Sequence, residues 1–141
     1  MPWPTESEHQ DLIARFHEGA VPASEFTHAA HLIVGLWHAA TLDQAIALTR
    51  MRAGILRLNA AHGTPNSDTR GYHETITRFY MQVVSRHVAR EGRAGDWAER
   101  ANRFVARYGS RELPLAHYSE ARLKSAEARY GWVEPDVKPL S

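Results

Sequence analysis

Two histidines lie three positions apart in the segment FTHAAHL, and a third follows later in GYHETIT. An α-helix turns by about 100° per residue, so His28 and His31 would project roughly 60° apart, from one face of a helix. His73, expected in the first turn of another helix, would face the same core as Thr77 and Tyr80. Neutral imidazoles are common ligands of divalent transition metals such as zinc, iron or manganese. The spacing therefore predicts a metal held by His28, His31 and His73, with an open position for water.

Glu74 and Tyr80 are the expected catalytic side chains of such a site. A metal-bound water needs a general base, and Glu74, a carboxylate next to His73, can serve as that base or as a fourth metal ligand. Tyr80 can hydrogen-bond the imidazoles and fix their tautomers. The expected reaction is hydrolysis or group transfer on a small molecule, or oxygen chemistry if the metal is iron. The alternative role of Glu74 is structural, as a charge at a helix N-terminus or a partner of Arg78.

His38 and Thr77 are expected to contact a substrate rather than the metal. His38 follows His31 by seven positions, which returns it to within roughly 20° of the same helical stripe. Thr77 shares the stripe of His73. The alternative for each buried histidine is a hydrogen bond to a carbonyl or hydroxyl, because an unpartnered buried imidazole is costly. In that case the protein binds a metal or small ligand without catalysis, or is an interaction module with a histidine-rich core.

The C-terminal segment carries a second group of polar residues. Arg122 and Arg129 are seven positions apart and share one face of a short helix, where they can form a lid over an anionic substrate. His117 is a candidate further metal ligand. The alternative is that these residues are exposed charges around a helix cap and a turn.

Apolar periodicity predicts an all-α, single-domain helical bundle over residues 1–141, with five to six helices and an irregular C-terminal tail. The expected helices run from a capping box at Thr5–Glu8 to Gly19, then over Glu25–Ala40, 41–62, 72–91, 96–108 and 119–130. Ser24 and Thr41 are the expected N-caps of the second and third helices. The segment Glu25–Ala40 is apolar on almost every side, which is typical of the central helix of a bundle. Pro135 and Pro139 exclude further helix.

The composition restricts the classes of function. With 141 residues, 43% of them hydrophobic, the chain suits one soluble domain. The absence of cysteine excludes disulfides and thiolate metal sites, and a net charge of +1 gives no footprint for nucleic acid or a membrane. The polar, acidic start MPWPTESEHQ predicts no signal peptide and therefore a cytoplasmic location. The expected partners are a small-molecule substrate and a second copy of the chain. A homodimer is expected because Trp3, Trp97 and Trp132 are too many large rings to fit together into one small core.

Three longer motifs carry a family resemblance: FTHAAHL at 26–32, GTPN at 63–66 ahead of GYHETIT at 71–77, and YSEARLKSAEAR at 118–129 followed by VEPD at 133–136. On these motifs the chain resembles a bacterial family of short all-helical proteins without an assigned activity, with Phe26 in place of an expected Trp. The resemblance implies that both histidine motifs belong to one recurring architecture. A looser similarity to DinB-like proteins implies a three-histidine metal site in a helical bundle, often found in thiol-dependent transferases. The order and spacing of the histidines here do not clearly match that pattern.

Overall fold

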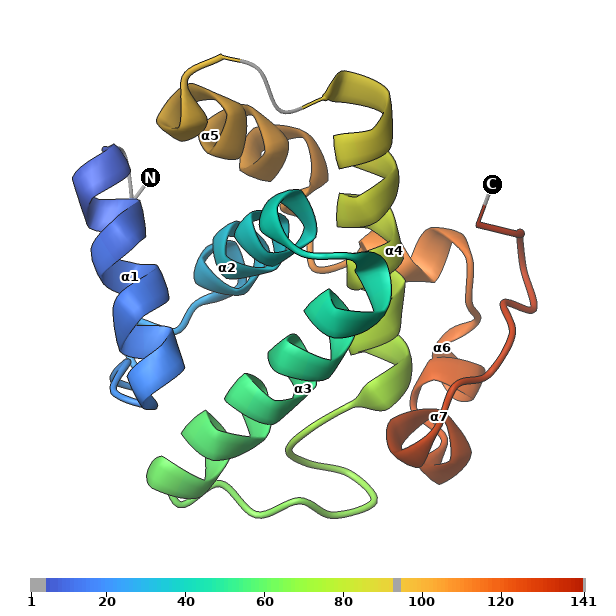
Figure 1. Ribbon diagram of the computed structural model, residues 1–141. Helices are drawn as coiled ribbons and strands as arrows, with labels where there is room; N and C mark the ends of the chain where they lie inside the picture. Colours follow the sequence, from blue (N-terminus) through green and yellow to red (C-terminus); the bar gives the residue numbers. More distant parts are fainter. Residues whose placement is uncertain (1–4, 93–94, 141) are drawn as a thin grey trace.

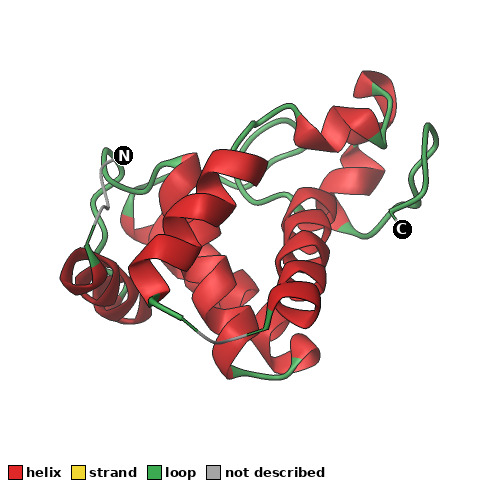
Figure 2. Ribbon diagram, turned by 90° about the horizontal axis from the view of Figure 1, so that it is seen from above, coloured by secondary structure: helices red, strands yellow, loops and turns green. Residues whose placement is uncertain are grey.

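The computed structural model describes residues 5–92 and 95–140, and within these ranges every regular element is a helix (Figure 2). The helices are α1 (Glu6–Glu18), α2 (His28–Thr41), α3 (Gln44–Ala61), α4 (Glu74–Glu91), α5 (Trp97–Tyr108), the 3-10 turn η1 (Leu113–Ala116), α6 (Glu120–Leu123) and α7 (Ala126–Tyr130). The all-α bundle expected from the sequence is confirmed. Trp3 and the centre of the expected break at Gly92–Gly95 lie outside the described residues.

The described part of the chain holds seven α-helices rather than five to six, because the helix expected over 119–130 is divided. The Ser125 hydroxyl donates to the carbonyl of Arg122 (2.7 Å) and accepts from the backbone N–H of Ala128 (3.1 Å). It therefore ends α6 and caps α7. A serine hydroxyl can bond to nearby backbone groups that would otherwise form helical hydrogen bonds. Here this divides one helix into two short ones.

Three helix starts also differ from the sequence prediction, because another side chain provides the N-cap. Thr27 caps α2 in place of Ser24, Asp43 caps α3 in place of Thr41, and His73 caps α4. Each of these side chains accepts a hydrogen bond from a backbone N–H three residues ahead. As a result, His28 and His31 lie in the first turn of α2, close to the loop that precedes it.

The helix α2 is the central element of the bundle and packs against α1, α3, α4 and α5 (Figure 1). Its buried residues include Ala30, Leu32, Ile33, Val34 and Leu36, which project in all directions around the helix axis. A helix that is apolar on every side can bury that surface only when other helices surround it. No helix in the described residues, α2 included, is long and apolar enough to cross a membrane.

The C-terminal region, from η1 to residue 140, packs against the outer side of α4. The Thr75 hydroxyl donates to the Gly131 carbonyl (2.7 Å) and accepts from the Val133 N–H (3.2 Å). Tyr118 donates to the Val133 carbonyl (2.7 Å) and is buried in a small apolar cluster. These bonds fix the irregular tail and bring Leu123, at the end of α6, against the start of α4.

Two of the three tryptophans from which a homodimer was predicted, Trp97 and Trp132, pack against rings of the same chain. The Trp97 ring meets the His9 ring edge-on with 6.1 Å between centroids, and the Trp132 ring meets Tyr118 in the same way at 6.3 Å. Both tryptophans are half-buried. These contacts cover part of each ring within one copy, and the homodimer stays a prediction.

Candidate functional site

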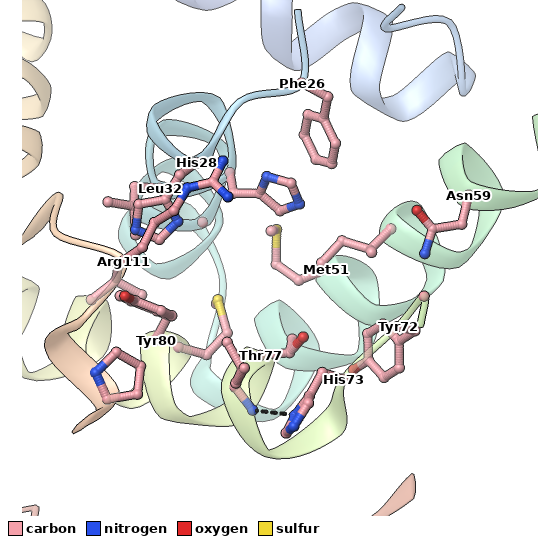
Figure 3. Close-up of a pocket in the computed structure, with 18 of the residues that line it drawn as sticks. Phe26, His28, Leu32, Met51, Asn59, Tyr72, His73, Thr77, Tyr80 and Arg111 are labelled. Carbon is pink, nitrogen blue, oxygen red and sulfur yellow. Dashed lines mark hydrogen bonds between the residues drawn. The ribbon is translucent and has the colours of Figure 1, made fainter. Parts of the chain in front are cut away.

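A pocket of about 380 Å³ opens between α2, α3 and α4, beside the turn that joins α5 to η1 (Figure 3). Apolar side chains such as Leu32, Met51, Ile55, Met81 and Val84 form much of its wall. The polar side chains on the wall are His28, His31, Asn59, Tyr72, His73, Thr77, Tyr80 and Arg111. A mainly apolar cavity with a few convergent polar groups is the usual form of a small-molecule site.

His31 presents a neutral imidazole whose Nε2 has no hydrogen-bond partner among the described residues. Its Nδ1 lies 2.9 Å from the Thr27 carbonyl, which only accepts, so Nδ1 carries the proton and Nε2 keeps its lone pair. The ring stacks on Phe26 with 3.7 Å between centroids. Burial lowers the pKa of His31 to about 4; the bond to Thr27 opposes this shift, and His28 and Arg111 add to it. At neutral pH the ring is therefore uncharged and able to accept a proton at Nε2.

His28 lies one turn before His31 and faces the same pocket. Its Nε2 is buried and has no hydrogen-bond partner among the described residues. The ring meets Tyr80 edge-on, with 5.0 Å between centroids, and burial together with the charge of Arg111 lowers the pKa of the imidazole. A buried nitrogen without a partner is uncommon in folded proteins and marks a place where a ligand atom would be favourable.

Arg111 lies at the rim of the pocket, beside His28 and Tyr80 (Figure 3). Its guanidinium has no ion-pair or hydrogen-bond partner in residues 5–92 and 95–140, although its charge lowers the pKa of His28 and His31. The turn that carries it is tied to α4, because the Tyr80 hydroxyl donates to the Ser110 carbonyl (2.9 Å). Burial raises the pKa of Tyr80 to about 12. Tyr80, expected to be catalytic, thus uses its proton to hold the turn next to Arg111.

His73 reaches the pocket wall, as the sequence predicts, but both of its nitrogens are engaged. Nδ1 accepts from the backbone N–H of Ile76 (3.1 Å), and Nε2 lies 2.7 Å from the Leu123 carbonyl, to which it donates. In the part of the chain that the structure describes, no group of three or more histidine and acidic side chains is placed to hold a metal ion. The three histidines therefore share a pocket without forming a ligand set in this arrangement, and the metal stays a prediction.

Glu74 does not line the pocket and joins α4 to α3. Its carboxylate accepts two hydrogen bonds from Arg52 (2.9 and 2.6 Å) and one from the Tyr72 hydroxyl (2.7 Å). Burial disfavours the charged form, but the bonds from Arg52 and Tyr72 outweigh it and hold the pKa of Glu74 below its usual value. The expected surface pair with Arg78 is not its main interaction. A carboxylate so engaged is an anchor between helices rather than a free base.

Of the residues expected to bind substrate, Thr77 lines the pocket and His38 does not. The His38 Nδ1 donates to the Val34 carbonyl (2.8 Å), and its Nε2 lies 3.2 Å from the Nε2 of His17 on α1. The stripe shared with His31 is real, but α2 is surrounded on all sides. The same face of α2 therefore lines the pocket at His31, near the start of the helix, and contacts α1 at His38, near its end.

The C-terminal candidates hold the fold together and do not line the pocket. Arg122 donates to the Glu134 carbonyl (2.6 Å), and Arg129 donates to the carbonyls of Asp68 (3.1 Å) and Gly71 (3.0 Å). The His117 Nδ1 lies 3.0 Å from the Lys138 carbonyl. These bonds fasten the loop before α4 and the tail to the C-terminal helices, so no lid of free arginines forms.

Sequence reasoning missed Arg111, Asn59 and Tyr72 as parts of the wall. Asn59 lies on α3, Tyr72 precedes α4, and Arg111 lies in a turn before a proline. The signals available were an arginine in a short loop and a lone asparagine in an apolar helical stretch. Neither signal identifies a pocket residue unless the segments that pack against it are known.

The double role of His73 leads to a stability prediction. We expect His73→Ala to lower the free energy of unfolding by about 2 kcal/mol, because it removes an N-cap and a second hydrogen bond. His73→Asn supplies a side-chain oxygen as cap acceptor in place of Nδ1 but not the bond to Leu123, so its loss should be about half as large. Urea denaturation followed by circular dichroism measures both. Equal losses in the two variants would contradict the capping role.

Comparisons with family models, curated proteins and solved structures found no match to this chain. The resemblances noted from the motifs therefore remain expectations. What the protein does has to be argued from the pocket and its chemistry.

Proposed function

We propose that this protein binds a small organic anion in the pocket between α2, α3 and α4 and exchanges a proton with it through His28 and His31. The observation that carries the proposal is the guanidinium of Arg111 at the pocket rim, without a partner among the described residues and beside two imidazoles. An arginine matches carboxylate and phosphate groups through paired hydrogen bonds. A bound anion would also give the buried His28 Nε2 an acceptor if that nitrogen is protonated.

The electrostatics of the wall favour an anion. His28 and His31 have lowered pKa values and are neutral at pH 7, so Arg111 supplies the positive charge at this end of the pocket. An incoming anion offsets that charge and raises the pKa of both imidazoles towards the neutral range. His31 can then act as a base, since its Nδ1 proton is held by Thr27 and its ring lines the pocket with no partner at Nε2 among the described residues.

The experiment is calorimetric titration with a panel of small carboxylates and phosphates. Arg111→Gln is expected to weaken anion binding at least about tenfold, since hydrogen bonds to charged groups contribute about 1.5–3 kcal/mol. Arg103→Gln, at an exposed arginine of α5 that does not line the pocket, is the matched control and should bind as the native protein does. Equal affinities for the two variants would refute the role of Arg111.

Proton exchange is tested by repeating the titration in buffers with different ionisation enthalpies. We expect net proton uptake on binding near pH 6.5, because the anion raises the imidazole pKa values. His31→Gln should reduce that uptake while the anion still binds through Arg111. Unchanged uptake would show that His31 is not the group that takes the proton.

A metal ion on His28 and His31 is the second candidate, favoured by the unpartnered Nε2 of His28. The protein would supply two nitrogen ligands, and water or ligand atoms would fill the remaining positions. Elemental analysis after exposure to zinc, iron or manganese tests it. We expect a bound metal to be lost in His28→Ala and retained in His73→Ala, since His73 is engaged as a helix cap. Loss of the metal in both variants would instead support the three-histidine set.

A further inference from the structure

The pocket has a second polar end, away from Arg111. Figure 3 shows Asn59 and Tyr72 on the side opposite Arg111, His28 and Tyr80, with Met51 between them. The Asn59 amide has no hydrogen-bond partner within residues 5–92 and 95–140, although it is half-buried on the wall. An amide presents both donor and acceptor groups, so it can bind a ligand atom of either kind.

The charges on the wall divide in the same way. Arg111 affects the pKa of His28, His31 and Tyr80, whereas the ionisable neighbours that affect Tyr72 are Glu74 and Arg52. Glu74 and Arg52 neutralise each other through their paired hydrogen bonds. The Tyr72 hydroxyl donates to Glu74. Burial and this bond raise the pKa of Tyr72 to about 12, and a hydrogen bond with Thr77 opposes the rise. This end of the pocket is therefore polar and has no net charge.

The cationic end matches a single negative charge. One guanidinium and two neutral imidazoles suit a carboxylate, because a phosphate monoester carries nearly two charges and needs more donors. The middle of the pocket is apolar, with Met51, Ile55 and Met81 on its wall. A fitting ligand is therefore charged at one end, apolar in its body and polar at the other end.

We infer that the ligand of this pocket is a small carboxylic acid with a hydroxyl or amide group at the end remote from its carboxylate, which Asn59 binds. The inference rests on the proposed function, since Arg111 must hold the carboxylate. Asn59 thereby selects among organic acids that Arg111 alone would not distinguish.

The test compares two series of probes, straight-chain alkanoates and their ω-hydroxy counterparts from butanoate to octanoate, by calorimetric titration. We expect one hydroxy acid of fitting length to bind the native protein about tenfold more tightly than its alkanoate, the effect of one buried hydrogen bond. Asn59→Leu should erase that preference, so that the hydroxy acid binds no more tightly than its alkanoate. Arg111→Gln should weaken both probes alike. Monobutyl phosphate is the probe for the alternative anion.

The outcomes separate this inference from the function on which it rests. If no carboxylate binds the native protein, both fail. If carboxylates bind through Arg111 but the alkanoates bind as tightly as the hydroxy acids, only the inference is overturned. A hydroxyl preference that survives in Asn59→Leu, or tighter binding of the phosphate than of butanoate, overturns it as well.

Discussion

Replacing Gly54 with alanine is expected to lower the free energy of unfolding by about 2–3 kcal/mol, the range for forcing atoms into a packed core. A Cβ at this position of α3 would lie 2.2 Å from Cζ of Phe16, far inside van der Waals contact. Phe16 is only 1% exposed and packs between the rings of Phe26 and His38, at centroid distances of 5.7 and 5.8 Å. The ring therefore has no free space to move into, and α1 must shift away from α3.

Gly35→Ala is the matched control, at a glycine inside α2. The nearest heavy atom to its added Cβ would be the Met81 sulfur, at 3.4 Å, at the end of a flexible side chain. We expect little loss or a small gain, because alanine is favoured over glycine in a helix by up to about 1 kcal/mol. Urea denaturation of both variants measures the difference. Similar stabilities of Gly54→Ala and Gly35→Ala would show that the contact with Phe16 does not set the spacing of α1 and α3.

Acidification is expected to destabilise the protein already in the pH range where histidines titrate, above the range where carboxylates become protonated. Burial is the first cause of a lowered pKa at His28, His31, His38 and His73, and His31 reaches about 4. The unfolded chain takes up these protons near pH 6.5, whereas the folded chain resists until lower pH. Stability is therefore fully present above about pH 6.5 and is lost as the pH falls towards 4. Each group contributes at most about 1.4 kcal/mol per pH unit, less where it is open to solvent.

Thermal melting between about pH 8 and pH 4.5 checks this prediction, because this range lies above the usual pKa of glutamate. We expect the melting temperature to fall steadily below pH 6.5. His31→Gln should show a shallower fall than the native protein, since glutamine carries no titrating group. A melting temperature that does not change over the range would contradict the expected penalty for charging buried histidines.

Much of the fold could be predicted from the sequence because its signals are local. The apolar segment around Ile33 predicted a central helix, and Asp96 predicted the cap of α5, where its side chain accepts from the Glu99 N–H (2.9 Å). The start of α2 was predicted less well, because serine and threonine are both good caps. Residues 22–26 instead form a turn, in which the N–H groups of Glu25 and Phe26 donate to the Pro22 carbonyl, and the helix begins after Thr27. The division at Ser125 was missed because a serine within a helical pattern can either continue the helix or bond to nearby backbone groups and interrupt it.

The sequence by itself determined that His28 and His31 share one face of a helix, because their spacing is a property of the helix alone. It also indicated that His73 and Thr77 turn towards the same space, and all four side chains line one pocket. Only the tertiary structure decided what these groups do. His73 finds its second partner at Leu123, 50 positions away, and Glu74 finds Arg52, 22 positions away. The approach of Arg111 to the two imidazoles likewise depends on packing between distant segments, and such contacts have no local pattern from which they could be read.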